Sequence, residues 1–300
     1  PPRSTLFPYT TLFRSDSMKV SLKELTLNLK SDRFEANIKG IDAEEFPTIP
    51  EKSANNFCTI PVAEFSEALK KVTIAAATDD ARPVLAGVLF KFEGKTLTMV
   101  ATDSYRLAEF KMEIPKETPK KEIIVPSRTM NEVLRLAQNA PQDGTIDLIV
   151  EENQIFFIIG ENQIVSRLIE GSFPNYEQII PASSKIKIEA DLAKTLSAIK
   201  MSSLFAKDIA NNIKFKTEKN GITIKSVAGE VGDTTSSVEA TTTGDPLEIA
   251  FNARYLMDAL TVLPGPEVIF SFNDALSPGL ISSKKEQNYT YLVMPLKLDN

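Results

Sequence analysis

The sequence predicts an α+β fold made of duplicated units, each joining one helix to several antiparallel strands. The main observation is a set of four amphipathic segments whose first residues lie 62 to 64 positions apart. A second observation is that the residues between them form alternating apolar runs bounded by turn residues. A fixed period of this kind indicates internal duplication. Because one helix on a small sheet buries too little apolar surface to be stable alone, we expect two units to form one domain.

The four repeated segments have the pattern of helices of about three turns. Each begins with a small, polar or proline residue, and its apolar residues recur at three- and four-residue intervals, which places them on one face. The predicted helices are Val62 to Val72, Pro126 to Ala137, Ala190 to Met201 and Asn252 to Leu263.

The runs between the helices predict hairpins. They are Val88 to Val100 around Glu93-Gly94-Lys95, Ile146 to Ile159 around Glu152-Asn153, and Ile213 to Val227 around Asn220-Gly221. The Asn-Gly pair is the strongest of these patterns, because both residues tolerate the positive φ that a tight turn requires. Gly94-Lys95-Thr96 also resembles the end of a phosphate-binding loop, but Leu89 stands where that loop requires its first glycine. We therefore interpret this segment as a turn.

Domain boundaries are predicted by two loops with a Phe-Pro then Ile-Pro pattern, Phe46 to Pro50 and Phe173 to Pro181. They delimit domains at residues 54–181 and 183–300. Residues 16–45 alternate apolar and polar without a preceding helix, so we expect the closing hairpin of a further, mostly missing domain. Residues 1–15 form a near-repeat without acidic side chains, and we interpret them as a non-native leader. The alternative is a genuine but divergent leader.

Composition excludes most catalytic and metal-binding classes. The 300 residues include no histidine, which removes Ser-His-Asp and Cys-His nucleophile systems and almost every ordinary zinc site. The carboxylates are scattered among lysines, as on a solvated surface, so we expect a binding protein without catalytic residues or a cofactor. The net charge of −6 argues against a nucleic-acid binder that uses its whole surface. It permits one whose basic residues gather on one face.

Cysteine usage and hydropathy indicate a cytoplasmic protein. The single cysteine, Cys58, cannot form an internal disulfide, and we expect it to be a small buried residue. The first residues lack the pattern of a signal peptide, and no apolar run has the length that spans a bilayer.

Five motifs in order give the chain a family resemblance. They are Arg82 to Gly87, Ala101 to Leu107, Phe173 to Pro181, Phe251 to Leu256 and Tyr291 to Leu298. On these motifs the chain, over residues 16–298, resembles the bacterial sliding clamp, the beta subunit of DNA polymerase III. The resemblance implies three similar domains per chain, each an internal duplication, with two chains closing head to tail into a ring around duplex DNA. Residues 16–50 then correspond to a remnant of the first clamp domain.

The resemblance also implies a hydrophobic pocket for short linear peptides carried by the polymerase catalytic subunit, the clamp loader and repair proteins. Its implied residues are Leu85, Thr102, Ser104, Tyr105, Arg106, Leu107, Pro181, Ile186, Tyr255, Leu292, Met294, Pro295, Leu296 and Lys297. Basic residues implied to face DNA are Lys70, Lys71, Arg82, Arg128, Arg135, Lys194 and Lys200. Leu204 and Phe205, placed after the third helix, match the apolar pair of the subunit interface.

Three functional interpretations remain open at this stage. The first is a replication clamp without catalytic activity, homodimeric in the full-length family. Because most of the first domain is missing from this chain, we expect it to stay monomeric or to associate weakly. The second is a β-rich peptide-binding adaptor that does not encircle DNA. The third is an enzyme that uses carboxylates or lysine, which requires a cleft with a strongly perturbed side chain.

Overall fold

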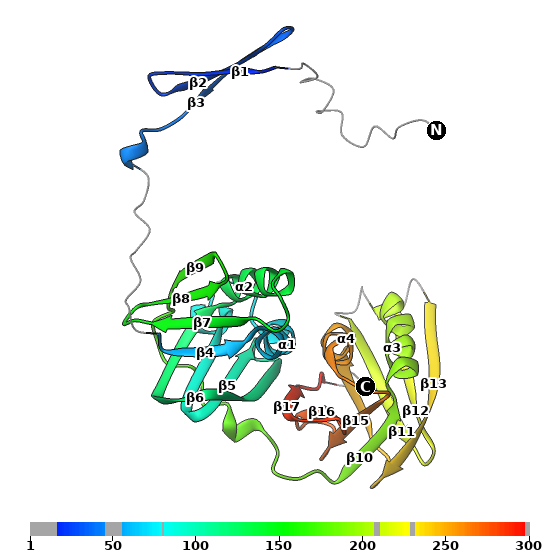
Figure 1. Cartoon of the computed structure of the whole chain (residues 1–300). Coiled ribbons are helices and arrows are strands. Elements are labelled where there is room, and N and C mark those ends of the chain that lie inside the picture. The colour runs from blue at the N-terminus through cyan, green and yellow to red at the C-terminus, as the bar shows by residue number, and fades with distance from the viewer. Residues whose placement is uncertain (1–16, 46–55, 80, 207–210, 229–231, 298–300) are drawn as a thin grey trace. The chain divides into compact units, whose positions relative to one another are not determined.

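The computed structural model describes residues 17–45, 56–79, 81–206, 211–228 and 232–297 (Figure 1). The chain divides into two compact units, residues 1–51 and 52–300. Three of the sequence-based predictions lie outside the described residues: the leader at 1–15, the Phe46 to Pro50 linker and the final Leu298.

The first unit contains a three-stranded antiparallel sheet that includes the predicted hairpin. Its strands are β1 (Lys19–Lys23), β2 (Thr26–Ser31) and β3 (Phe34–Lys39), in the order β1-β2-β3, followed by a short 3-10 turn at Ala43–Glu45. The predicted hairpin is formed by β2 and β3, with Leu29 opposite Ala36. Strand β1, which was not predicted, also alternates and pairs with β2, with Val20 opposite Leu29.

Four helices in the second unit confirm the predicted repeat. They are α1 (Val62–Val72), α2 (Ser127–Asn139), α3 (Leu192–Ala206) and α4 (Ala253–Val262). The Asn252 side chain accepts a hydrogen bond from the Arg254 N–H at 2.9 Å and so starts α4. Helix α3 extends five residues beyond the predicted end, to Ala206. Leu204 and Phe205 therefore lie within the helix and not after it, which corrects their predicted position.

Two antiparallel sheets complete the second unit. A four-stranded sheet has the order β4-β7-β8-β9, and a ten-stranded sheet has the order β14-β11-β12-β13-β10-β15-β16-β17-β6-β5. The strands are β4 (Cys58–Pro61), β5 (Gly87–Thr102), β6 (Arg106–Pro126), β7 (Thr145–Val150), β8 (Gln154–Ile159), β9 (Asn162–Arg167), β10 (Ile186–Asp191), β11 (Asn212–Glu218), β12 (Gly221–Ala228), β13 (Gly232–Thr243), β14 (Glu248–Asn252), β15 (Glu267–Phe272), β16 (Gly279–Ser283) and β17 (Glu286–Val293).

The hairpins at Glu152-Asn153 and Asn220-Gly221 are confirmed, but the turn predicted at Gly94 is wrong. Strand β5 runs through Gly94 without reversing and pairs with β6 along nearly its whole length. The pairing register shifts on both sides of Gly94, whose φ of 61° lets the strand bulge at little steric cost. The chain reverses instead after Thr102, where β5 ends.

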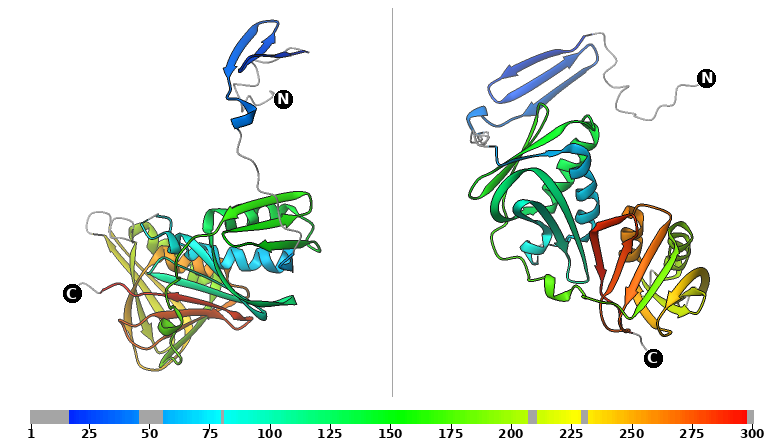
Figure 2. Two further views of the ribbon diagram at one scale, coloured as in Figure 1. Left: turned by 90° about the vertical axis from the view of Figure 1, so that its left-hand side faces the viewer. Right: turned by 60° about the horizontal axis from the view of Figure 1, so that its bottom comes forward.

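The ten-stranded sheet crosses the boundary predicted at residues 181–183, because β17 pairs with β6. The domain limits of 54–181 and 183–300 stay a prediction. Inward-facing side chains, including Phe65, Phe90, Phe251 and Phe270, form one large core between the sheets and the helices. Helix α1 contacts both α2 and α4, and α4 contacts α3, so the helices form a row in the order α2-α1-α4-α3 (Figures 1 and 2).

Candidate functional site

The junction of β6 and β17 brings the two sequence motifs of the predicted pocket together. Leu107 pairs with Leu292, and the Met294 N–H donates to the Tyr105 carbonyl at 2.8 Å. The turn before β6 is closed by Asp103, whose Oδ1 accepts from the Tyr105 and Arg106 N–H groups, both at 2.9 Å. This bonding fixes the Tyr105 side chain at the surface, where it is 59% exposed.

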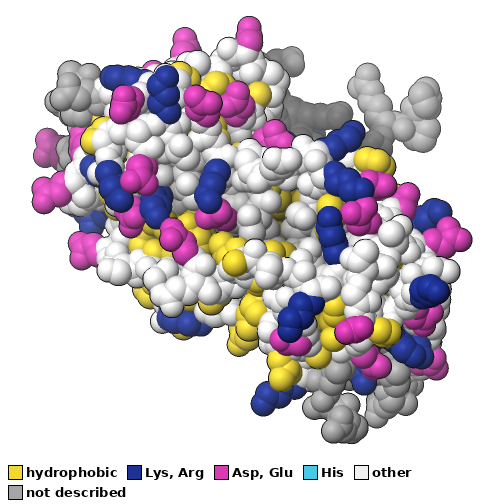
Figure 3. All heavy atoms as spheres, turned by 90° about the horizontal axis from the view of Figure 1, so that it is seen from below, with side chains coloured by type: hydrophobic (Ala, Val, Ile, Leu, Met, Phe, Trp, Pro, Cys, Tyr) yellow, Lys and Arg dark blue, Asp and Glu magenta, His cyan; other side chains and the backbone are white. Residues whose placement is uncertain are grey.

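The outer face of this junction carries a second apolar cluster, separate from the main core. We call it the outer-face cluster; its buried members are Leu89, Val100, Leu107, Ile124, Tyr176 and Leu292, and its half-buried members are Val84, Ile169, Phe173, Ile180, Leu280 and Met294. Alternation along β6 explains it, since Ala108 and Phe110 face the main core while Leu107 faces outward. Figure 3 shows hydrophobic side chains reaching the surface of this sheet face, with charged groups of both signs around them.

Only some of the predicted pocket residues belong to the outer-face cluster. Leu107, Leu292 and Met294 share the outer-face cluster. Ile186 does not: it is 5% exposed and packs with Ile188 in the main core, so it lies outside the outer-face cluster, and its role in the pocket stays a prediction. The reason is strand parity, because Ile186, Ile188 and Ala190 alternate along β10 and all pack in the main core.

The remaining predicted pocket residues, which lie outside the outer-face cluster, differ in burial. Leu85 is buried in a 3-10 turn at Pro83–Ala86, and Pro181 is half-buried in the segment that leads to β10. Thr102 is buried, with its hydroxyl donating to the Arg106 carbonyl at 2.6 Å. Ser104 is exposed, with a φ of 79°. Pro295 and Leu296 are half-buried, and Lys297 is exposed.

Arg106 holds the turn against α4. Its guanidinium bonds to Asp103 at 3.0 Å and Asp258 at 2.5 Å, and lies 4.4 Å from the centre of the Tyr255 ring. Burial by itself lowers the pKa of Arg106, but the neighbouring Tyr291 and Asp258 have the larger combined effect and raise this pKa above its ordinary value. Tyr105 in turn stacks on Tyr255 with ring centres 6.5 Å apart. An aromatic pair braced by a buried cation thus borders the outer-face cluster.

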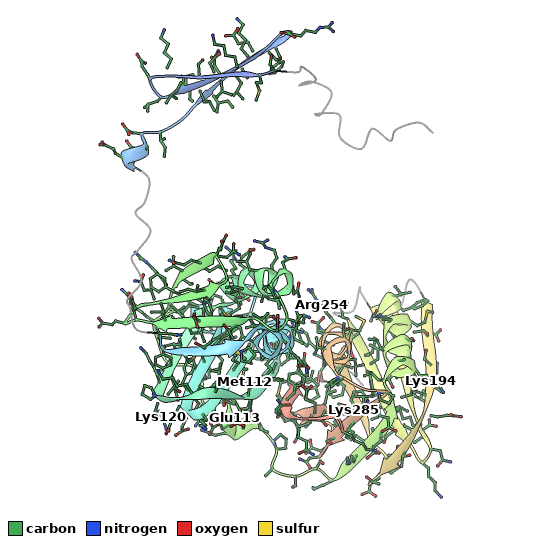
Figure 4. All side chains as sticks on the ribbon, viewed as in Figure 1. Met112, Glu113, Lys120, Lys194, Arg254 and Lys285 are labelled. Carbon is green, nitrogen blue, oxygen red and sulfur yellow. The ribbon has the colours of Figure 1, made fainter. Side chains whose placement is uncertain are left out.

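The predicted DNA-facing residues divide into exposed and buried groups. Lys70 on α1, Arg128 and Arg135 on α2, and Lys194 and Lys200 on α3 are exposed on the helix row, whereas exposed Arg82 precedes a 3-10 turn. Figure 4 shows Lys194 on α3 and Arg254 on α4; Arg254 is an exposed base outside the predicted set.

Lys71 was predicted to face DNA, but the structure shows it buried. It is 3% exposed, and its ammonium contacts Glu67 and Glu286 inside the protein. It is therefore unavailable to a phosphate.

The two residues of the predicted subunit interface reach the protein surface at the end of α3. Leu204 is 58% exposed and Phe205 is half-buried.

Comparison with known proteins identifies the family. The model of the DNA polymerase III beta subunit central domain matches residues 59–175, and that of its C-terminal domain matches residues 177–297. The beta sliding clamp of Staphylococcus epidermidis is 30% identical over 271 residues, which cover 90% of this chain and 71% of that protein. The chain belongs to the DNA polymerase III beta sliding clamp family. The predicted assignment to the replicative clamp is thereby confirmed.

Solved clamp structures share the fold. The sliding clamp from Bacillus subtilis superposes with a TM-score of 0.85 at 28% identity, covering 94% of this chain and 75% of that one. The Pseudomonas aeruginosa clamp bound to griselimycin gives 0.83 at 27% identity, covering 94% and 76%. The predicted α+β clamp fold is confirmed.

Neither a metal-binding cluster nor a membrane-spanning helix is present among the described residues. No group of three or more His, Cys, Asp or Glu side chains there could hold a metal ion. Within the same ranges, no helix has the length and apolar character needed to cross a membrane.

Proposed function

We propose that this chain is a non-catalytic subunit of a replication clamp, a protein that in its full-length form encircles duplex DNA as a homodimeric ring. It presents the outer-face cluster to short peptides of the polymerase catalytic subunit, the clamp loader and repair proteins in the cytoplasm. The observation that carries the proposal is the junction of β6 and β17, where Leu107, Leu292 and Met294 form one apolar site beside exposed Tyr105.

The chemistry of the junction suits a peptide with one or two large apolar side chains. Met294 is unbranched and half-buried, so it adapts to different anchors at modest cost. The turn beside it supplies polar groups that fix the direction of a bound backbone. The griselimycin complex of the Pseudomonas aeruginosa clamp supports the proposal, because it shows that a related clamp binds a ligand.

The helix row supports the DNA part of the proposal. Its exposed bases can attract phosphates of any sequence, and such contacts are weak enough individually to permit sliding. A ring retains DNA by its topology, so this function requires no catalytic group.

A peptide titration tests the proposed pocket. A short peptide with a glutamine and a terminal Leu-Phe pair is expected to bind with roughly micromolar affinity, as small apolar anchors allow. Met294→Ala is expected to weaken binding by about 1–3 kcal/mol, because it removes a flexible wall of the site. Fluorescence polarisation measures the affinity, and circular dichroism verifies the fold.

Met201→Ala is the matched control. Met201 is 53% exposed on α3, so its truncation removes the same side chain away from the junction. Equal affinity in the Met294→Ala, Met201→Ala and unaltered chains would place the peptide elsewhere.

A further inference from the structure

A polar cavity of about 630 Å³ continues from the outer-face cluster along the same face of the ten-stranded sheet. Tyr176 and Ile180 belong to both, and Pro181 lines the cavity as well. Leu107 is followed two positions later on β6 by Glu109, and Leu292 is preceded two positions earlier on β17 by Thr290. The cluster and the cavity are therefore neighbouring parts of one surface.

The cavity contains a carboxylate that the protein holds in a fixed position. Glu109 is only 5% exposed. Its Oε2 accepts a hydrogen bond from the Tyr176 hydroxyl at 2.8 Å, and its Oε1 lies 3.0 Å from the Lys111 ammonium. The Lys111 side chain is 56% exposed, so it can move aside without losing packing.

A second carboxylate stands at the opening. The Oε1 of Glu177 lies 3.0 Å from the Lys91 ammonium, and the Glu177 side chain is 62% exposed, so its carboxylate remains open to another donor. The cavity lining also includes Glu93. Its Oε1 lies 3.2 Å from the ammonium of Lys120, an exposed residue that is not part of the lining. Each of the three lining carboxylates thus has one lysine partner, and no lysine of the lining is left without a carboxylate.

We propose that partner peptides extend from the outer-face cluster into this cavity and place an arginine or lysine against Glu177 and Glu109. This inference rests on the proposed peptide-binding function and adds a charge preference to it. An anionic group is disfavoured, since both lysines of the lining already contact carboxylates.

The geometry sets where the basic residue lies in the peptide. Leu107 and Lys111 are four positions apart on one strand, which corresponds to about 13 Å. A bound peptide in the extended conformation has the same rise of about 3.3 Å per residue. The basic side chain should therefore lie about two to four residues from the apolar anchors.

The test is a binding series with the whole chain. The parent peptide carries a glutamine and a terminal Leu-Phe pair, and its variants carry one Arg, Ala or Glu two to four residues to either side of the anchors. At one position at least, the Arg peptide is expected to bind about 2- to 5-fold more tightly than the Ala peptide, the size of one partly exposed ion pair. The Glu peptide is expected to bind more weakly than both.

Variants of the protein locate the effect. Glu177→Gln should bring the ratio of Arg to Ala affinities close to one, and Lys91→Met should increase it by releasing Glu177. Glu64→Gln, which removes an exposed carboxylate from α1, should leave the ratio unchanged. Equal affinities throughout the series, a preference for Glu, or an Arg advantage that survives Glu177→Gln would overturn the inference while leaving the peptide site intact. Failure of the parent peptide itself to bind would refute the proposed site and, with it, this inference.

Discussion

Lys71 provides the most demanding stability test in this structure. Its ammonium contacts Glu286 of β17, and the side chains of the two residues are 4% and 8% exposed. It also lies 5.3 Å from the Phe110 ring centre and 5.9 Å from that of Tyr289. The pair joins α1 to a strand 215 residues away along the chain. We predict that Lys71→Met destabilises the protein although it preserves most of the apolar volume.

The expected magnitude follows from the charge that remains. Removing one partner of a buried ion pair leaves the other uncompensated, which costs about 3–5 kcal/mol. In this case Glu286 Oε2 is already buried without a hydrogen-bond partner among the described residues, so no second donor takes over. Loss of the Glu67 contact adds little, because that carboxylate is 54% exposed. The double change Lys71→Met with Glu286→Gln should recover most of the loss, since it removes both charges.

Urea unfolding followed by circular dichroism measures these differences in the free energy of unfolding. Lys70→Met, at the exposed neighbouring position, is the control and should change the free energy of unfolding by less than about 0.5 kcal/mol. A cost below about 1 kcal/mol for Lys71→Met, or no recovery in the double variant, would show that the pair is not buried in the way described.

The remaining predictions concern DNA and the single thiol. Neutralising Arg128 and Arg135 should flatten the dependence of log affinity on log salt by at most about two units, measured with several duplex sequences. A loss confined to some sequences would contradict a sliding role. Burial, followed by the nearby Asp147 charge, raises the pKa of the Cys58 thiol to about 12. The native chain should therefore resist thiol reagents at pH 8 until it is unfolded. Because the folded chain keeps this proton after the unfolded chain has lost it, stability should fall between about pH 9 and pH 12. Replacing Cys58 with alanine should reduce that fall, whereas rapid labelling of the native thiol would show that it is not enclosed.

The sequence by itself determined the presence and order of the helices, two of the hairpins and the family. Helix α1 begins and ends where its apolar spacing and flanking residues predict, and α4 begins after the Asn252 cap. Asn220-Gly221 forms the expected turn because its conformational preference is local. These features depend on residues a few positions apart, so the order of side chains along the chain was sufficient to predict them.

The tertiary structure decided which face and which partner each residue received. Glu93-Gly94-Lys95 suits a tight turn and a bulge equally well, and the long pairing of β5 with β6 selected the bulge. Lys70 and Lys71 are adjacent lysines of one helix, but only Lys71 meets a carboxylate from β17 and is buried by it. The outer-face cluster and the cavity beside Glu109 likewise exist only because β17 pairs with β6. Contacts between residues so far apart along the chain depend on how the strands assemble, and local sequence preferences do not contain that information.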